Sequence, residues 1–137
     1  MTDTNSKEKV VLIVDDVEYS RQLLRNSILQ VCQHEQIRTK RFTIVNASSG
    51  QSTFAKIEQH KPELIFLDIE LPDMSGIEIL KKIKADFPKI CIIMVSGQST
   101  IANVKESLTN GAAGFIVKPF SGDKVLEALK NFEKRMK

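Results

Sequence analysis

Short runs of apolar residues alternate along the chain with longer stretches in which apolar residues recur every three or four positions. The short runs are rich in Val, Ile and Leu, and few polar residues interrupt them, which is typical of strands buried on both faces. The longer stretches have the spacing of amphipathic helices. The predicted strands are Val10–Val14, Phe42–Asn46, Leu64–Leu67, Ile90–Val95 and Phe115–Val117.

A helix is expected after each predicted strand. Pro62 and Pro88 predict the ends of the second and third helices, and Asn110-Gly111 predicts the end of the fourth. Parallel strands need helical crossovers, so the pattern predicts an α/β fold, an open doubly wound parallel sheet of five strands with helices on both faces. The apolar positions that mark the helices are Leu24, Ile28 and Val31; Phe54 and Ile57; Ile79, Leu80, Ile83 and Phe87; Ile101, Val104 and Leu108; and Val125, Leu129, Phe132 and Met136.

Two polar stretches lie outside this pattern. Residues 1–9 are expected to be a disordered N-terminal tail, so that residues 10–137 form a single domain. Gln33–Arg41 is the most polar connection and is expected to be an exposed turn. Its basic residues Arg38, Lys40 and Arg41 are predicted to be solvated and not to bind nucleic acid, because no aromatic residues interleave with them.

The composition narrows the class of protein. With 137 residues, 42% of them apolar, the chain can form one domain with one sizeable core. The net charge of +3 from 20 basic and 17 acidic residues does not indicate a nucleic-acid-binding protein. Cys32 and Cys91 form no C-x-x-C motif and are interpreted as reduced thiols. The absence of a secretory signal or of a span long enough for a bilayer favours a cytoplasmic protein that does not associate with membranes.

The most informative polar residues lie where the predicted strands end. Asp15 and Asp16 follow the first strand, Asp68 follows the third, Ser96 the fourth and Lys118 the fifth. In open α/β sheets, ligands bind outside the carboxyl ends of the strands, where the strand order reverses. These side chains are therefore expected to converge on one crevice.

Three carboxylates in one crevice repel one another unless a cation compensates. Mg²⁺ is the natural candidate, because it takes oxygen ligands and usually one or two carboxylates, and no Cys or His lies near these acids to favour Zn²⁺. Lys118 and Ser96 suit a bound phosphoryl group, and an aspartate can itself accept one to give an aspartyl-phosphate. The metal and Lys118 would then neutralise charge on the transferring oxygens.

Each of these residues also has a structural alternative. Asp15 could cap the following helix, with Glu18 placed as in a capping box. Asp68 could be a turn acid, Ser96 could cap the next helix, and Lys118 could be a solvated surface lysine. Each alternative is plausible alone, but all of them together, at the ends of four strands of one fold, are a much less plausible coincidence.

Ordered motifs over nearly the whole chain carry a family resemblance. The chain resembles a bacterial two-component response-regulator receiver domain, of the stand-alone type related to chemotaxis regulators. One motif alone is a weak signal, but the ordered set is highly specific. The motifs are Val11-Leu-Ile-Val-Asp-Asp16, Leu64-Ile-Phe-Leu-Asp68, Leu71-Pro-Asp-Met-Ser-Gly76, Ile93-Met-Val-Ser-Gly97 and Gly111-Ala-Ala-Gly-Phe-Ile-Val-Lys-Pro-Phe120.

The resemblance implies a flavodoxin-like strand order, 2-1-3-4-5. It implies that Asp68 is the phosphoacceptor. It further implies that Asp16 and Asp68 bind Mg²⁺ directly, that Asp15 acts through water, and that the main-chain carbonyl of Glu70 is a further ligand.

The resemblance also assigns the residues of a switch. Ser96 matches the hydroxyl residue that reaches for the phosphoryl group, Lys118 matches the phosphate-pairing lysine, and Phe115 matches the aromatic position coupled to Ser96. The Lys118–Pro119 bond matches one that is cis in this family. Glu70 and Gln98 stand where the family tunes dephosphorylation.

This sequence departs from the family pattern in two ways. The connection before the second strand looks longer than usual, and Phe115 lacks the hydroxyl of the Tyr found there in some relatives.

The implied function is that of a switch and not of an enzyme with a separate substrate, since such a domain catalyses only its own phosphorylation and dephosphorylation. The implied partners are a sensor histidine kinase or phosphotransfer protein and a downstream protein target. The implied output surface is the fourth helix, fifth strand and fifth helix. A monomer or weak dimer is expected. Whether the chain acts alone or is a piece of a longer regulator stays open, as do the stimulus, the output and the phosphoryl lifetime.

Three other classes of protein compete with this interpretation. Hydrolases of the haloacid-dehalogenase type also phosphorylate an aspartate, but they carry a D-x-D motif after an early strand, and no cap domain fits in 137 residues. A flavin or nucleotide carrier is disfavoured because the chain has neither G-x-G-x-x-G nor a P-loop, and its acids repel a phosphate. A degenerate adaptor is disfavoured by the complete set of acids, Ser and Lys.

Overall fold

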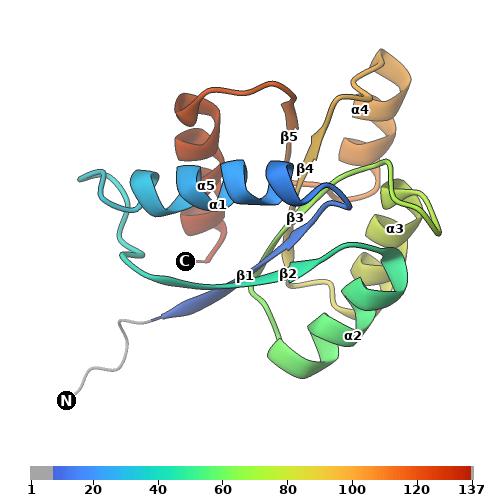
Figure 1. The fold of residues 1–137 in the computed structure, drawn as a ribbon, viewed down its shortest axis with the longest axis horizontal. Helices are drawn as coiled ribbons and strands as arrows, with labels where there is room; N and C mark the ends of the chain where they lie inside the picture. Colours follow the sequence, from blue (N-terminus) through green and yellow to red (C-terminus); the bar gives the residue numbers. More distant parts are fainter. Residues whose placement is uncertain (1–7, 137) are drawn as a thin grey trace.

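Within residues 8–136, which the computed structural model describes, five parallel strands form one sheet with helices on both faces (Figure 1). Strands and helices alternate along the chain, as predicted. The strands are β1 (Lys9–Val14), β2 (Phe42–Ala47), β3 (Leu64–Leu67), β4 (Cys91–Ser96) and β5 (Gly114–Val117). The helices are α1 (Glu18–Val31), α2 (Gly50–His60), α3 (Gly76–Asp86), α4 (Ile101–Thr109) and α5 (Gly122–Arg135).

The strand order is β2-β1-β3-β4-β5, which confirms the predicted order. Strand β1 pairs in parallel with β2 on one side and with β3 on the other. The chain thus crosses to opposite sides of β1 in its first two βα units, and the order reverses between β1 and β3. This reversal places the crevice for a ligand at the carboxyl ends of those two strands.

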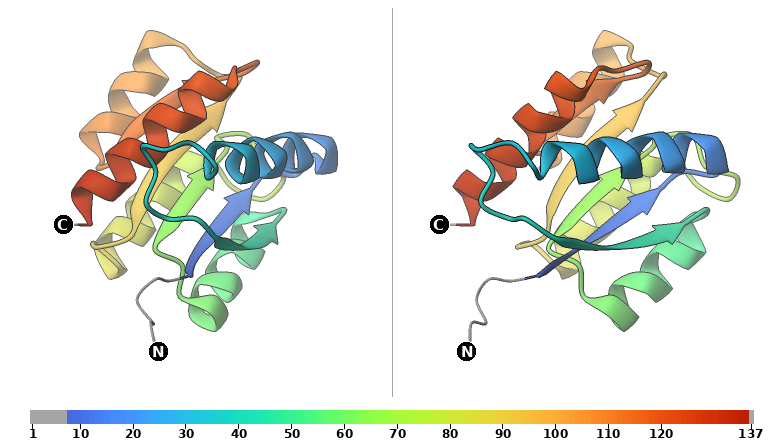
Figure 2. Two further views of the ribbon diagram at one scale, coloured as in Figure 1. Left: turned by 90° about the vertical axis from the view of Figure 1, so that its left-hand side faces the viewer. Right: turned by 60° about the vertical axis from the view of Figure 1, so that its left-hand side comes forward.

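Side chains alternate across the sheet, so the buried apolar residues of the described chain form one cluster on each face. One cluster joins alternate strand residues, such as Val11 and Phe66, to α1 and α5. The other joins the intervening strand residues, such as Leu12 and Leu67, to α2 and α3. Figure 2 shows α1 and α5 side by side over the first of these faces. The uninterrupted apolar runs of the sequence follow from burial on both faces.

Helix α4 is the least buried of the helices in the described structure. It packs against β5 and α3, and Lys81 of α3 forms an ion pair of 3.3 Å with its Glu106. Ser107 is its only buried residue, and the Ser107 hydroxyl has no hydrogen-bond partner among residues 8–136. Ile101 at its start is 87% exposed. This helix therefore has little apolar burial to hold it in one position.

The connection between α1 and β2 is not simply an exposed turn, which corrects the prediction for Gln33–Arg41. Ile37 and Thr39 are buried, although the basic residues Arg38, Lys40 and Arg41 are exposed, as expected. Glu133 of α5 accepts hydrogen bonds from the N–H groups of Arg38 (3.0 Å) and Thr39 (2.6 Å) and from the Thr39 hydroxyl (2.7 Å). The buried carboxylate fastens the connection to α5 because it satisfies these otherwise unpaired donors.

The ends of the chain also differ from the predictions. Residues 1–7 of the expected tail lie outside the described residues, but Lys9 already belongs to β1, where its N–H bonds to the Arg41 carbonyl. Met136 lies beyond the last residue of α5 and is 43% exposed, so it does not extend the apolar stripe.

Cys32 and Cys91 are buried free thiols. Among residues 8–136, no helix is long and apolar enough to cross a membrane.

Candidate functional site

The predicted site residues meet at the carboxyl edge of the sheet. Asp15 directly follows β1, Asp68 follows β3, Ser96 is the last residue of β4, and Lys118 follows β5. Asp15, Asp68 and Ser96 are buried, although all three are polar. Polar side chains are seldom buried together unless they are paired, so their contacts determine what the site can do.

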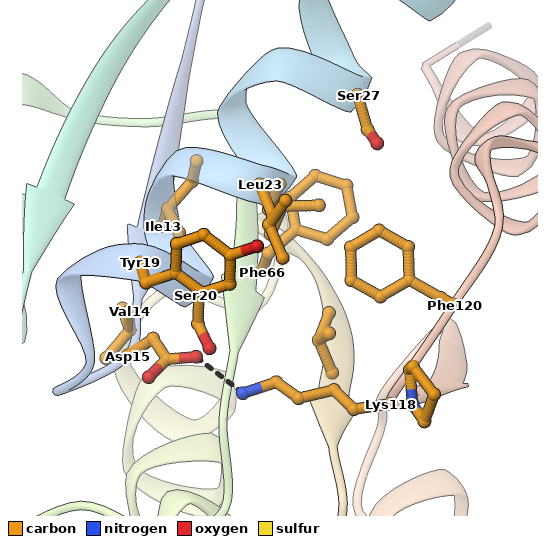
Figure 3. A pocket seen from close by; sticks show the side chains of 13 residues that line it. Ile13, Val14, Asp15, Tyr19, Ser20, Leu23, Ser27, Phe66, Lys118 and Phe120 are labelled. Carbon is orange, nitrogen blue, oxygen red and sulfur yellow. Dashed lines mark hydrogen bonds and ion pairs between the residues drawn. The ribbon is translucent and has the colours of Figure 1, made fainter.

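Lys118 is the centre of these contacts. Its Nζ lies 2.6 Å from Oδ2 of Asp15 (Figure 3) and 3.0 Å from Oδ2 of Asp68. A single ammonium group thus bridges the ends of β1, β3 and β5. Partial burial by itself lowers the pKa of Lys118. Its hydrogen bonds and ion pairs with the two aspartates outweigh burial, so its pKa lies above the usual lysine value. The alternative that Lys118 is a solvated surface lysine is therefore wrong.

The other oxygen of each buried aspartate accepts a hydrogen bond from a neighbouring loop. Oδ1 of Asp15 accepts the Val17 N–H (2.9 Å), and Oδ1 of Asp68 accepts the Glu70 N–H (3.3 Å). Val17 is the N-cap residue of α1 and makes no side-chain capping bond. Asp15 thus shapes the turn before α1 but does not cap the helix through a capping box.

The donor chemistry of the site fits Mg²⁺ better than a softer metal. Asp16 is exposed beside the buried pair, and the nearby ligands are carboxylate and carbonyl oxygens without thiol or imidazole groups. Within residues 8–136, no group of three or more His, Cys, Asp or Glu side chains has the geometry of a metal site. Lys118 already occupies the space between Asp15 and Asp68. A bound Mg²⁺ would therefore rely on one or two carboxylates, a main-chain carbonyl and water, which is its usual coordination in proteins.

The loop between β3 and α3 turns back tightly beside Asp68. Glu70 forms an isolated bridge with Ser75, and the Gly76 N–H donates to the Ile69 carbonyl at 2.7 Å. A Cβ atom at Gly76 would overlap the Asp68 carbonyl oxygen, so only glycine fits where α3 begins. The loop is therefore a compact unit next to Asp68.

Ser96 does not cap α4, because the N-cap residue of that helix is Thr100. The buried Ser96 hydroxyl accepts the Gln98 N–H at 3.0 Å instead. The Gln98 side chain reaches across the crevice and donates to the Glu70 carboxylate at 2.8 Å. The loops after β3 and β4 are thus joined beside Asp68.

Phe115 lies on the same face of the sheet as Ser96. In the register of β4 and β5, Met94 pairs with Phe115 and Ser96 pairs with Val117, so Phe115 is two positions back from Ser96 on the neighbouring strand. Phe115 is half-buried against the apolar cluster on the α2 and α3 side. The Lys118–Pro119 bond that follows β5 is cis, as expected from the family pattern.

A cavity of about 360 Å³ opens beside the ion pair, between α1 and the segment after β5 (Figure 3). Tyr19 and Leu23 of α1 line one side and Phe120 lines the other, with Phe66 between them. Tyr19 is 68% exposed and Leu23 is 46% exposed. The sequence pattern did not predict this cavity, because both residues look like ordinary surface positions of an amphipathic helix.

Comparisons with known proteins agree with this geometry. The family model described as the response regulator receiver domain matches residues 11–130. The chemotaxis protein CheY of Listeria monocytogenes is 35% identical over 125 residues, which cover 90% of this chain and 98% of that protein. CheY of Bacillus subtilis is 34% identical over 119 residues, covering 87% and 92% of the two chains. The crystal structure of a CheY-like receiver domain protein from Methanospirillum hungatei aligns with a TM-score of 0.80 at 30% identity, over 95% of this chain and 98% of that one.

Proposed function

Because the chain belongs to the response regulator receiver domain family, whose members act as signalling switches, we propose that it accepts a phosphoryl group on Asp68. The donor is the phosphohistidine of a sensor kinase or phosphotransfer protein, or a small phosphodonor, and the reaction depends on Mg²⁺. The observation that carries this proposal is the Lys118 ammonium against the Asp68 carboxylate at the point where the strand order reverses.

For phosphoryl transfer to Asp68, the protein mainly has to position the reacting groups and the charges that stabilise the transferred oxygens. An oxygen of Asp68 forms a bond to phosphorus while the bond from phosphorus to the donor's leaving atom breaks. Lys118 neutralises charge on the transferred oxygens, and the buried setting strengthens that interaction. Mg²⁺ would be held by Asp16, Asp68 and the Glu70 carbonyl, with Asp15 acting through water, and would supply further positive charge.

Ser96 and Phe115 carry the response. The phosphoryl group adds about −1.5 to −2 of charge and strong acceptor oxygens, which draw the Ser96 hydroxyl away from the Gln98 N–H. Phe115 on the same face then turns into the space that Ser96 leaves. Thinly packed α4, together with β5 and α5, forms the surface that changes. The exposed apolar side chains Leu108 and Val117 give a protein target a surface to bind.

The phosphodonor protein is proposed to cover the cavity beside α1. This cavity reaches Asp15 and Lys118, so a partner that presents a histidine to Asp68 also contacts Tyr19 and Leu23. The buried free thiols suit the reducing cytoplasm, where we place the reaction. The domain is proposed to work as a monomer or weak dimer without binding nucleic acid.

Intact mass spectrometry tests the acceptor assignment. Wild-type protein incubated with acetyl phosphate and Mg²⁺ is expected to gain one phosphoryl group, and the gain is expected to vanish when EDTA removes the metal. Asp68→Asn is expected to gain none, whereas the control variant Asp86→Asn, which removes an exposed acid at the end of α3, is expected to gain one like wild type. A full phosphoryl adduct on Asp68→Asn, or steady hydrolysis of a small phosphoester by wild type, contradicts the proposal.

A further inference from the structure

Asp73, at the tip of the loop between β3 and α3, contacts a helix far away in the sequence. Its Oδ1 accepts the Gly50 N–H at 2.7 Å and its Oδ2 accepts the Gln51 N–H at 3.0 Å. These are the first two amides of α2, where a negative charge is also favoured by the helix dipole. Both carboxylate oxygens are thus used in one long-range contact.

Helix α2 does not need Asp73 as its cap. Ser49 is the N-cap residue, and Ser49 and Ser52 form a complete capping box. The box satisfies the Ser49 and Ser52 amides, and Asp73 binds the two amides that lie between them. The contact therefore attaches the loop to the helix, in addition to the helix's own capping.

The residue after Asp73 interlocks with the same helix. A Cβ atom at Gly50 would overlap the Met74 side chain, so Met74 packs closely against the start of α2 in the space that Gly50 leaves free. Two consecutive loop residues, one polar and one apolar, are thus seated on one helix terminus. The hydrogen bonds of Asp73 and the packing of Met74 together hold the tip of the loop in place, beyond the attraction of its charge to the helix terminus.

The other end of this loop starts at Asp68, the proposed phosphoacceptor. The Glu70–Ser75 bridge and the Gly76 N–H bond to Ile69 close the loop on itself, so the tip and Glu70 belong to one compact unit. The Glu70 N–H in turn donates to Asp68. A displacement of the tip must therefore be transmitted to Glu70 and to the Asp68 carboxylate.

We propose that Asp73 is a positioning residue for the phosphorylation site. By holding the loop on the start of α2, it keeps the Glu70 main-chain carbonyl and the Asp68 carboxylate in the arrangement that binds Mg²⁺. Residues that orient metal ligands from outside the coordination shell typically contribute about 10–100-fold to metal affinity. This inference rests on the proposed Mg²⁺-dependent function and adds a residue that does not touch the metal.

The test compares Mg²⁺ binding by wild type, Asp73→Ala and Asp73→Asn. Mg²⁺ is titrated without any phosphodonor while the amide NMR signals of the loop between β3 and α3, residues 68–75, are followed. Asp73→Ala is expected to weaken Mg²⁺ binding about tenfold. Asp73→Asn is expected to lie between it and wild type, because one amide oxygen can still accept a hydrogen bond. Phosphorylation by acetyl phosphate is then expected to recover towards the wild-type rate when Mg²⁺ is raised to saturation.

Two control variants separate positioning from general destabilisation. Ser49→Ala weakens α2 through its own cap but leaves the Asp73 carboxylate in place, so it is expected to lower the melting temperature and keep the Mg²⁺ affinity. Asp86→Asn removes an exposed acid at the end of α3 and is expected to change neither. Unchanged Mg²⁺ affinity in Asp73→Ala, or an equal loss in Ser49→Ala, overturns the inference. If Asp73→Ala does not fold, Asp73→Asn decides by the same criteria. A wild-type protein that binds Mg²⁺ but is never phosphorylated rejects the proposed function and leaves the positioning result standing.

Discussion

At the scale of single residues, the site consists of a lysine between two aspartates. Sequence position was enough to bring Asp15, Asp68 and Lys118 to one edge, because all three follow parallel strands. The pairing of Lys118 with both acids was not predicted, although it follows from the alternation of side chains between the two faces of the sheet. Counted along the strands, all three fall on the face that bears α1 and α5. Asp73 and Gly76 lay inside a recognised motif, but their roles depend on contacts that no local pattern shows.

Removing the cation of Lys118 is expected to have opposite effects on metal binding and on phosphorylation. Lys118→Met leaves the Asp15 and Asp68 carboxylates uncompensated, so Mg²⁺ is expected to bind several times more tightly. The same variant is expected to be phosphorylated more slowly, because no ammonium group meets the transferred oxygens. Metal titration and acetyl phosphate kinetics measure the two effects, with Lys124→Met as a surface control. Weaker Mg²⁺ binding in Lys118→Met contradicts the proposed competition between the lysine and the metal.

Asp15 and Asp16 are neighbours with different surroundings, and their variants are expected to differ. Asp16→Asn is expected to weaken Mg²⁺ binding more than Asp15→Asn, because Asp16 is the proposed direct ligand. Asp15 is buried against Lys118 and is proposed to act through water. Metal titration of the two variants measures the difference. Equal affinities, or a preference of wild type for Zn²⁺, count against this arrangement.

At the scale of elements, periodicity predicted each strand and helix but missed how one connection is held. Gln33–Arg41 looks polar, and neither Ile37 nor Thr39 belongs to a periodic run. They are buried because Glu133 bonds to this segment from a helix 94 positions further along the chain than Thr39. Burial alone raises the pKa of Glu133. The hydrogen bonds from Arg38 and Thr39 outweigh it, so its pKa lies below the usual glutamate value.

Glu133 is therefore expected to make stability depend on pH. Its folded-state pKa is depressed, so its contribution is complete above the unfolded value of 4.5 and is lost as the pH falls through the folded value. Glu133→Gln is expected to lower the free energy of unfolding by about 2 kcal/mol at neutral pH. That difference is expected to shrink between about pH 5 and pH 3. Urea unfolding across this range measures it, and Glu127→Gln on the exposed side of α5 is the control. A difference that is constant with pH argues against a charged Glu133 in the folded protein.

At the scale of the whole molecule, the switch must carry a local change to a surface. Moving a two-state equilibrium from 1:99 to 99:1 needs about 5.5 kcal/mol of differential stabilisation, whereas a hydrogen bond to a charged group contributes about 1.5–3 kcal/mol. Ser96 therefore cannot supply the change alone and must share it with Lys118 and the metal. The weak burial of α4 lowers the free energy that is needed to move this helix.

Ser96→Ala is accordingly expected to leave phosphorylation nearly intact and to make the conformational shift incomplete. Amide NMR shifts with and without the phosphoryl mimic beryllofluoride measure the extent of the change in wild type and variant. Wild-type shifts are expected to spread from Asp68 over residues 98–136. If they stay within the loops around Asp68, the proposed route through Ser96 and Phe115 is wrong.

The two-sided sheet has a consequence for how such a domain diversifies. Tyr19 and Leu23 lie on the side of α1 and α5, whereas Ile101 and Leu108 belong to α4 on the side of α3 (Figure 1). Substitutions at residues that share no neighbours usually have additive effects. Substitutions at Tyr19 and Leu23 can therefore change which phosphodonor protein is recognised while Ile101 and Leu108 still meet the same target. Helix α5 belongs to both sides of this division, because it packs against α1 and is part of the proposed output surface. A lineage or an engineer can thus change the input without disturbing the output where the substitutions avoid α5.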